Sequence, residues 1–150
     1  MNTLSLYNKV SALPFGKYIF SKLLAFRAPY FSSINPRVKE LRAGYCRVEI
    51  NDRRAIRNHI GSINAGAMCT LSELTGGLAL EASIPSTLRW IPKEMTVQYT
   101  KKATGSLTGI CALDVDTLKA GDVRIPFEIK DASGDSVLKT EILFYISERG

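Results

Sequence analysis

Apolar and polar residues follow a helical spacing at the start of the chain and an alternating spacing over much of the rest. Between residues 13 and 27 apolar residues recur at helical intervals and interleave with basic ones, which predicts an amphipathic helix. The apolar members are Leu13, Phe15, Tyr18, Ile19, Leu23, Leu24 and Phe26. We expect this helical part to end near Ala28 and Pro29. Residues 31–36 are expected to form a loop, because Pro36 cannot continue a helix.

Alternation of apolar with polar residues predicts five strands. The first is residues 43–50, a half-buried strand. Four later segments show the same period, and their apolar faces are Met95, Val97 and Tyr99; Leu107, Cys111, Leu113 and Val115; Val123, Ile125, Phe127 and Ile129; and Ile142, Phe144 and Ile146. Turn residues at 104–105, 120–122 and 133–135 predict that these four strands form an antiparallel meander.

Between the first strand and the others, residues from about Asn64 to Ala82 are predicted to form one long apolar helix. Gly76 and Gly77 lie inside it, where each costs about 1 kcal/mol relative to Ala. Another element must therefore approach the helix backbone closely at these positions, and a curled sheet or the helix of a second subunit would do so. A long helix with antiparallel strands around it belongs to the α+β class.

Composition favours one domain without covalent reinforcement. A chain of 150 residues, 45% hydrophobic, is long enough to bury a core of its own. The odd number and wide spacing of Cys46, Cys69 and Cys111 predict reduced core thiols in a reducing compartment rather than disulfides or metal ligands. No apolar run approaches the ~20 residues of a membrane span. Lys9 and Pro14 interrupt any secretory signal, so the expected location is the cytoplasm.

The formal net charge of +6 lies entirely in the N-terminal segment. Residues 1–39 contain no Asp or Glu, and their basic residues are Lys9, Lys17, Lys22, Arg27, Arg37 and Lys39. The simplest interpretation is a helix that docks on the core and keeps its lysines in water. Contact with an anionic membrane, contact with an acidic carrier protein and, in a eukaryotic source, an acid-poor transit peptide are the alternatives.

Glu73 is a single carboxylate among the apolar residues of the long helix. Burying an unpaired charge costs several kcal/mol, so such a group must be paired or used in chemistry. The structural alternative is an ion pair with one of three arginines, Arg47, Arg54 or Arg57.

The segment that leads to this carboxylate carries a motif. It reads Asn58-x-x-Gly61-x-x-Asn64-Ala65-Gly66, followed by six residues and Glu73. This pattern resembles the active-site segment of hotdog-fold acyl-CoA thioesterases of the phenylacetate-degradation and 4-hydroxybenzoyl-CoA type. Residues 99–105 also resemble the strand end that follows in that superfamily. The stretch 28–31 and the N-terminal helices are similar to a bacterial branch of it. The family usually has His at position 64 and Gly at position 65, so this chain departs from it at two positions.

The resemblance implies a hotdog fold, a long central helix wrapped by a five- to six-stranded antiparallel sheet. Residues 1–36 would form a helical extension of a single domain, and residues 43–148 the core. The implied reaction is hydrolysis of acyl-CoA thioesters to the free acid and CoA. It needs no metal or cofactor, since CoA is part of the substrate.

Residue roles follow from the same resemblance. Glu73 would act as nucleophile or general base. The N–H of Ala65 at the helix start would contact the thioester carbonyl, with Asn64 and Gly66 beside it and the Asn58 side chain assisting. The implied substrate-binding residues are Gly61, Tyr99, Lys101 and Lys102. The simpler interpretation of the paired lysines and of Arg53-Arg54 is that they are solvated at strand ends. The functional interpretation is that they bind the phosphates of CoA.

Helix geometry adds a constraint on the catalytic unit. Ala65 and Glu73 are eight residues apart, about 12 Å along a helix, which is too far for both to touch one carbonyl carbon. The resemblance supplies a solution, because hotdog proteins form dimers whose sites combine the helix start of one chain with the carboxylate of the other. We therefore expect a homodimer or a dimer of dimers.

Other functions remain as alternatives. One is a non-catalytic hotdog protein that binds acyl thioesters or lipids, and another is an acyl-carrier-protein thioesterase that uses the basic N-terminal segment. His59 is the only histidine and is expected to be structural, since no Ser-His-Asp spacing surrounds Ser62 or Ser72. The basic half carries no nucleic-acid-binding signature, so no nucleic acid partner is expected. Trp90 is expected to serve packing.

Overall fold

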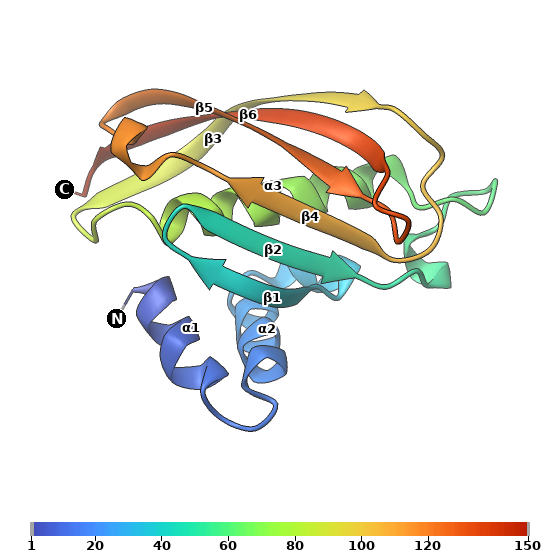
Figure 1. The fold of residues 1–150 in the computed structure, drawn as a ribbon, viewed down its shortest axis with the longest axis horizontal. Helices are drawn as coiled ribbons and strands as arrows, with labels where there is room; N and C mark the ends of the chain where they lie inside the picture. The colour runs from blue at the N-terminus through green and yellow to red at the C-terminus, as the bar shows by residue number, and fades with distance from the viewer. Residues whose placement is uncertain (1, 150) are drawn as a thin grey trace.

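One long helix, α3 (Ala65–Glu81), is wrapped by a six-stranded antiparallel sheet in the computed structural model, which describes residues 2–149 (Figure 1). The strands lie in the order β1-β2-β4-β5-β6-β3. Their bounds are β1 (Arg37–Arg42), β2 (Tyr45–Ile50), β3 (Leu88–Tyr99), β4 (Leu107–Ala112), β5 (Gly121–Lys130) and β6 (Ser136–Glu148). The predicted α+β class, with a long central helix inside an antiparallel sheet, is confirmed.

Helix α3 forms where the sequence predicts it. Asn64 caps it, since its Oδ1 accepts the Gly66 N–H at 2.7 Å, and Ala82 closes the other end. Most side chains between Met68 and Leu80 are buried, because the sheet surrounds one side of the helix and the N-terminal segments touch another. A helix that is apolar on nearly all sides is stable only when it is surrounded in this way.

The two glycines inside α3 lie where side chains of the sheet approach the helix backbone closely. A Cβ on Gly76 would lie 3.0 Å from the Phe127 ring, and one on Gly77 would lie 2.7 Å from the Trp90 ring. The close approach that the sequence predicts is therefore made by strands β3 and β5 of the same chain. The expected packing role of Trp90 is confirmed, since its ring also meets Phe144 edge-on at a centroid distance of 5.2 Å.

The predicted meander is correct for three of its four strands. β4, β5 and β6 are consecutive neighbours, but β3 pairs with β6 and not with β4. The reason lies in residues 100–106, which do not form a tight turn but cross beside the start of α3, where Ile63 N–H donates to the Ala103 carbonyl at 2.9 Å. β3 therefore ends the sheet, and its second edge is unpaired in the single chain.

Strand boundaries differ from the prediction at two places. β1 was not predicted, because its inward residues Val38 and Leu41 are separated by a bulge that breaks the alternation. The sheet therefore begins at residue 37 and not at 43. Leu113 and Val115, expected at the end of β4, lie beyond it, and Val115 starts the short 3-10 helix η3 (Val115–Thr117).

The N-terminal segment is a hairpin of two helices, α1 (Thr3–Ser11) and α2 (Gly16–Arg27), which contact β1 and project away from the sheet (Figure 1). Pro14 lies in the turn between them, and the expected loop is largely the 3-10 helix η1 (Pro29–Ile34). The hairpin is anchored by Tyr7 and Phe20, whose rings meet edge-on at 5.0 Å. No helix of residues 2–149 is long and apolar enough to cross a membrane.

The expected docking of the amphipathic helix on the core is wrong for most of its apolar residues. Only Leu24 among them is half-buried. The exposed ones are Leu13, Phe15, Tyr18, Ile19, Leu23 and Phe26. The hairpin is held through other side chains, so its predicted apolar face is turned to solvent.

The three cysteines are free thiols. Cys46 and Cys111 face each other on β2 and β4 and are buried as predicted. Burial raises the pKa of Cys111 to about 12 and that of Cys46 well above its usual value. The prediction of a core position is wrong for Cys69, which is only partly buried.

Candidate functional site

The loop before α3 is organised by Asn58. Its Oδ1 accepts the backbone N–H groups of Ile60 and Ser62 at 3.1 Å each, and its Nδ2 donates to Ser62 Oγ at 2.8 Å. Gly61 sits at the bend with a φ of 74°, a conformation that favours glycine. Asn58 and Gly61 thus shape this loop, and both ends of the Asn58 carboxamide are engaged inside it.

A second cluster, which the sequence did not reveal, ties the loop to the connection between β3 and β4. Arg57 donates to both Asp52 oxygens at 2.6 and 3.0 Å, and the Gly105 N–H donates to Asp52 at 3.1 Å. The Arg57 guanidinium lowers the pKa of the Asp52 carboxyl from its usual value. Asp52 and Arg57 are five residues apart, whereas Gly105 is 53 residues from Asp52, so only the fold brings Gly105 to the pair.

The start of α3 offers one free backbone donor among the predicted residues. Asn64 is the N-cap, and its side chain turns back to take the Gly66 N–H. Ala65 is the first helical residue, and within residues 2–149 its N–H has no hydrogen-bond acceptor. Asn64, Ala65 and Gly66 are consecutive at the helix start, and of the Ala65 and Gly66 N–H groups only that of Ala65 is left without an acceptor in the described structure.

Glu73 lies two helical turns further along α3 and is half-buried. Its carboxylate has neither a hydrogen bond nor an ion pair to any described residue. Arg57 is bound to Asp52, and neither Arg47 nor Arg54 pairs with Glu73, so the structural ion-pair alternative is wrong. Glu73 is thus an unpartnered carboxylate on the side of α3 that the sheet leaves open.

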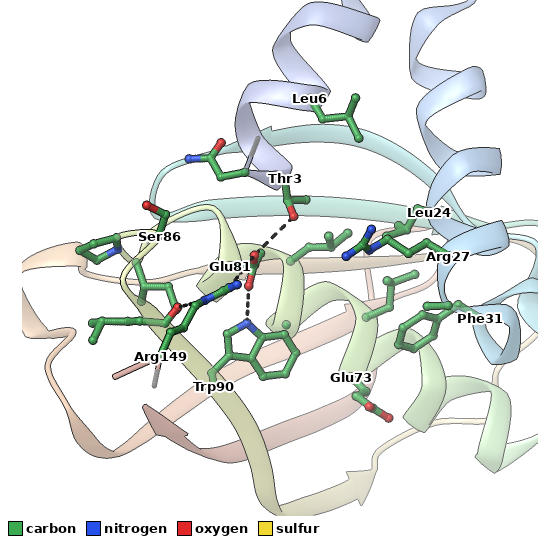
Figure 2. A pocket seen from close by; sticks show the side chains of 18 residues that line it. Thr3, Leu6, Leu24, Arg27, Phe31, Glu73, Glu81, Ser86, Trp90 and Arg149 are labelled. Carbon is green, nitrogen blue, oxygen red and sulfur yellow. Dashed lines mark hydrogen bonds and ion pairs between the residues drawn. The ribbon is translucent and has the colours of Figure 1, made fainter. Parts of the chain in front are cut away.

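A cavity of about 520 Å³ adjoins Glu73 between the N-terminal helices, α3 and the start of β3 (Figure 2). Its volume is in the range of sites for small ligands. Its apolar lining includes Leu6, Leu24, Phe31, Leu74, Leu78 and Trp90. Figure 2 shows Glu73 at one end of this cavity, with its carboxylate directed away from Glu81.

The other end of the cavity is polar. Trp90 Nε1 donates to Glu81 at 2.8 Å, Thr3 Oγ1 lies 3.5 Å from the same carboxylate, and Arg149 is 3.9 Å away. Arg27 of α2 also lines this cavity and directs its guanidinium into it (Figure 2). Sequence reasoning missed this set of residues, because they come from both ends of the chain and from the middle.

Tyr99 lies near the first turns of α3. Its hydroxyl is 3.4 Å from the Cys69 Sγ, one helical turn before Glu73. The hydrogen bond to Cys69, followed by burial, raises the pKa of Tyr99 to about 12. The fold therefore brings the predicted Tyr99 onto the first turns of α3 through Cys69, and the phenol remains protonated at neutral pH.

The basic residues predicted to hold CoA phosphates differ in whether other residues of the chain already bind them. The Lys101 ammonium lies 2.9 Å from Asp131 and 2.6 Å from Asp135, so two carboxylates already engage it. Arg53 donates to the Ser33 carbonyl. Lys102 and Arg54 are exposed and have no ion pair within the described part of the chain, which leaves these two as the candidates for a phosphate.

His59 is exposed in the loop, whereas the Ser62 hydroxyl is buried and accepts from Asn58. The hydroxyl of Ser72 is also buried and donates to the Met68 carbonyl. Neither serine is hydrogen-bonded to His59 in the described structure, so a catalytic triad is not assembled. Residues 2–149 contain no group of three or more His, Cys, Asp or Glu that could hold a metal ion.

Residues 16–146 of the sequence match the family described as Domain of unknown function (DUF4442). The chain belongs to this family. The solved structure named genomics APC5556 is 34% identical, with 98% of this chain and 99% of that chain covered and a TM-score of 0.87. No curated protein matches the chain significantly.

Other solved structures extend the comparison to proteins with a named activity. PA5026 from Pseudomonas aeruginosa, described as a protein of unknown function and probable thioesterase, is 25% identical over 91% of this chain and 97% of its own, with a TM-score of 0.80. The thioesterase HI1161 from Haemophilus influenzae shares the fold alone, at 10% identity over 79% of this chain and 82% of its own, with a TM-score of 0.72. The fold is thus that of the hotdog thioesterases, as the sequence predicts.

Proposed function

We propose that this DUF4442 protein hydrolyses acyl-CoA thioesters. The observation that carries the proposal is the unpartnered Glu73 carboxylate, which lies beside an apolar cavity on the open side of the central helix of a thioesterase fold. A carboxylate without an ion pair beside a cavity can accept a proton from a bound water molecule, and this is the role of a general base.

The chemistry requires little machinery because the thioester is already reactive. Glu73 takes a proton from a water molecule, whose oxygen forms a bond to the carbonyl carbon, and the carbonyl oxygen becomes an oxyanion. The Ala65 N–H, at the positive end of the α3 dipole, donates to that oxyanion. The oxyanion then re-forms the carbonyl as the C–S bond breaks, the carboxylic acid leaves, and the CoA thiolate accepts the proton that Glu73 took from water.

We place the two groups of one site on two chains. Within one chain the start of α3 and Glu73 are separated by about 12 Å of helix. The unpaired edge of β3 offers a strand of 12 residues for pairing with its copy, and Ile91 and Tyr99 on it are exposed. Pairing of two β3 edges across a two-fold axis would set the second α3 beside the first.

The acyl group is assigned to the cavity beside Glu73. Its apolar walls include Leu74 and Leu78 of α3, together with Leu24 and Phe31. Each CH₂ group of an acyl chain buried there would contribute about 0.8 kcal/mol to binding. The CoA moiety would remain outside, where Lys102 and Arg54 are free to meet its phosphates.

The test is steady-state release of CoA thiol from a panel of straight-chain acyl-CoAs and aromatic acyl-CoAs, with an acyl-carrier-protein thioester as a separate substrate. We expect turnover of acyl-CoA, with kcat/KM rising with chain length until the cavity is filled. A protein that binds acyl-CoAs but releases no thiol from any of them would refute hydrolysis.

That outcome would support a second function, a non-catalytic acyl-thioester or lipid-binding protein. One observation favours it: Asn64 stands where the similar enzymes usually have His, and its side chain caps the helix by taking the Gly66 N–H. An N–H that is occupied in this way is lost to an oxyanion. Release only from the carrier-protein thioester would instead assign the substrate to an acyl carrier protein.

A further inference from the structure

The turn between α1 and α2 presents large apolar side chains to solvent. This turn lies at the end of the helical hairpin that is farthest from the sheet (Figure 1). The Leu13 side chain in it is 58% exposed and that of Phe15 is 86% exposed. Contiguous exposed apolar groups of this size are unusual on a soluble surface and mark sites of protein or membrane contact.

The conformation of Phe15 is unfavourable for folding alone. Its φ of 57° lies in the left-handed region, which bulky residues rarely adopt and which costs about 1 kcal/mol or more. The turn is tight: a Cβ on Gly16 would lie 1.8 Å from the Val10 carbonyl oxygen, so the backbone leaves no room for a side chain at position 16. An aromatic residue is thus held in a strained backbone conformation with its ring in water, and packing within the chain does not explain it.

Helix α2 continues the apolar surface. Ile19, Leu23 and Phe26 follow Phe15 at intervals of three or four residues, so they lie on one side of the helix, and the Phe26 side chain is 87% exposed. We call Leu13, Phe15, Ile19, Leu23 and Phe26 the N-terminal apolar face.

The charged residues of the hairpin that carries this face are all positive. Lys9 and Lys17 flank the turn, and Lys22 lies within the helical stripe, 5.3 Å from the centre of the exposed Tyr18 ring. No Asp or Glu occurs before Glu40. Lys22 also borders a hollow of about 400 Å³ beside Phe26, where Ser32 and Asn35 add polar groups.

We propose that the N-terminal apolar face docks on the surface of an anionic phospholipid bilayer. Leu13 and Phe15 would enter the boundary between headgroups and acyl chains, and Lys9, Lys17 and Lys22 would meet the phosphates. An acidic protein would satisfy the lysines, but it would not explain the large apolar side chains that are exposed beside them at the far end of the hairpin. Shape and charge together fit a fluid apolar layer beneath a negative surface. This inference does not depend on the proposed hydrolysis.

The test is co-sedimentation of the full chain with vesicles at about 0.1 M salt, where charge attraction still acts over about 10 Å. Vesicles of phosphatidylcholine alone are compared with vesicles that also contain phosphatidylglycerol. We expect binding to the anionic vesicles that weakens as salt is raised. Leu13→Ser/Phe15→Ser should reduce the partition coefficient at least tenfold, and Lys9→Gln/Lys17→Gln by about fivefold for each charge removed. Val115→Ser/Lys119→Gln, an exposed apolar and basic pair on the connection from β4 to β5, is the matched control and should bind as the wild type does.

A second measurement reports insertion directly. The double variant Phe15→Trp/Trp90→Phe carries its only tryptophan in the turn between α1 and α2. The fluorescence emission of that tryptophan should shift to shorter wavelength when anionic vesicles are added. No binding to anionic vesicles, or no blue shift, overturns the proposal. If the wild type ignores vesicles but binds an acidic carrier protein, the partner of this face is a protein. Light scattering gives the third outcome. If the wild type does not sediment with vesicles and Leu13→Ser/Phe15→Ser dissociates an oligomer of the protein, a second copy of the chain covers the N-terminal apolar face.

Discussion

The indole ring of Trp90 lies directly over the backbone of Gly77, so close that a Cβ at position 77 would be 2.7 Å from its Cη2 atom. The ring cannot move away easily, because its Nε1 donates to Glu81 and its edge meets Phe144. A glycine that weakens the helix by about 1 kcal/mol is therefore required by the strand that crosses it.

Replacing Gly77 by Ala is expected to destabilise the protein by about 1 to 2 kcal/mol, because overpacking outweighs the gain in helix propensity. In a Trp90→Phe background the smaller ring leaves room, so the same Gly77→Ala change should stabilise. Urea unfolding of the four variants gives the sign of the effect in each background. The same loss in both backgrounds would mean that Trp90 is not the obstacle.

The sequence was sufficient for the central part of this fold. Gly76 and Gly77 indicated a close approach to the helix, and alternation located β2, β5 and β6. It was insufficient where the alternation is interrupted: the bulge between Val38 and Glu40 hid β1.

The candidate site was predicted only where its residues are close in sequence. The sequence placed the segment from Asn58 to Gly66 and the carboxylate of Glu73 in one candidate site, but it did not indicate the cavity that adjoins Glu73. Its walls come from α1, α2, α3, β3 and Arg149, which meet only in three dimensions. The expected burial of the N-terminal apolar residues failed for a related reason, since periodicity shows which residues share a face but not whether that face meets the core.

Glu73→Gln is expected to abolish thiol release while leaving the stability within about 0.5 kcal/mol of wild type, because the carboxylate has no partner to lose. The measurements are single-turnover hydrolysis and urea unfolding. Glu128→Gln, a half-buried carboxylate on β5, is the control and should keep both properties. A Glu73→Gln protein that turns over normally but unfolds early would make this residue structural.

Asn58→Ala should lower kcat by roughly 10- to 1,000-fold if Asn58 donates to the carbonyl. The geometry favours an indirect effect, since the side chain holds the Ile60 and Ser62 N–H groups. Asn58→Asp separates the two roles, because it keeps the acceptor and removes the amide donor. Activity near wild type in Asn58→Asp, together with a loss in Asn58→Ala, would identify a positioning residue; equal losses in both would identify a donor.

The pair of Asp52 and Arg57 predicts a pH dependence of stability. Because the folded pKa of Asp52 is lowered by Arg57, its stabilising effect is present at neutral pH and is lost as the pH falls through the folded pKa. Asp52→Asn should therefore be less stable than wild type at pH 7, and the difference should shrink below about pH 4. Urea unfolding at several pH values measures it, with the exposed Asp116→Asn as control. A constant difference at all pH values would mean that the ion pair does not contribute.

The shared site is tested by subunit exchange, for which the helix start offers a specific variant. Ala65 is the first residue of α3, a position where proline is favoured because its missing N–H would be free in any case. Asn64, with φ of −63° and ψ of 140°, already has the extended conformation required before proline. Ala65→Pro should therefore fold and lose only the N–H assigned to the oxyanion.

Mixing the inactive Ala65→Pro and Glu73→Gln proteins and allowing exchange should restore activity. Each mixed dimer would combine an intact helix start from one chain with an intact carboxylate from the other in one of its two sites, so random pairing gives about a quarter of wild-type activity. The control mixes Glu73→Gln with the Ala65→Pro/Glu73→Gln double variant, in which no chain carries the carboxylate, and this mixture should stay inactive. If mass spectrometry shows the mixed dimer and the first mixture is still inactive, the Ala65 N–H of one chain and the Glu73 carboxylate of the other do not act in the same site.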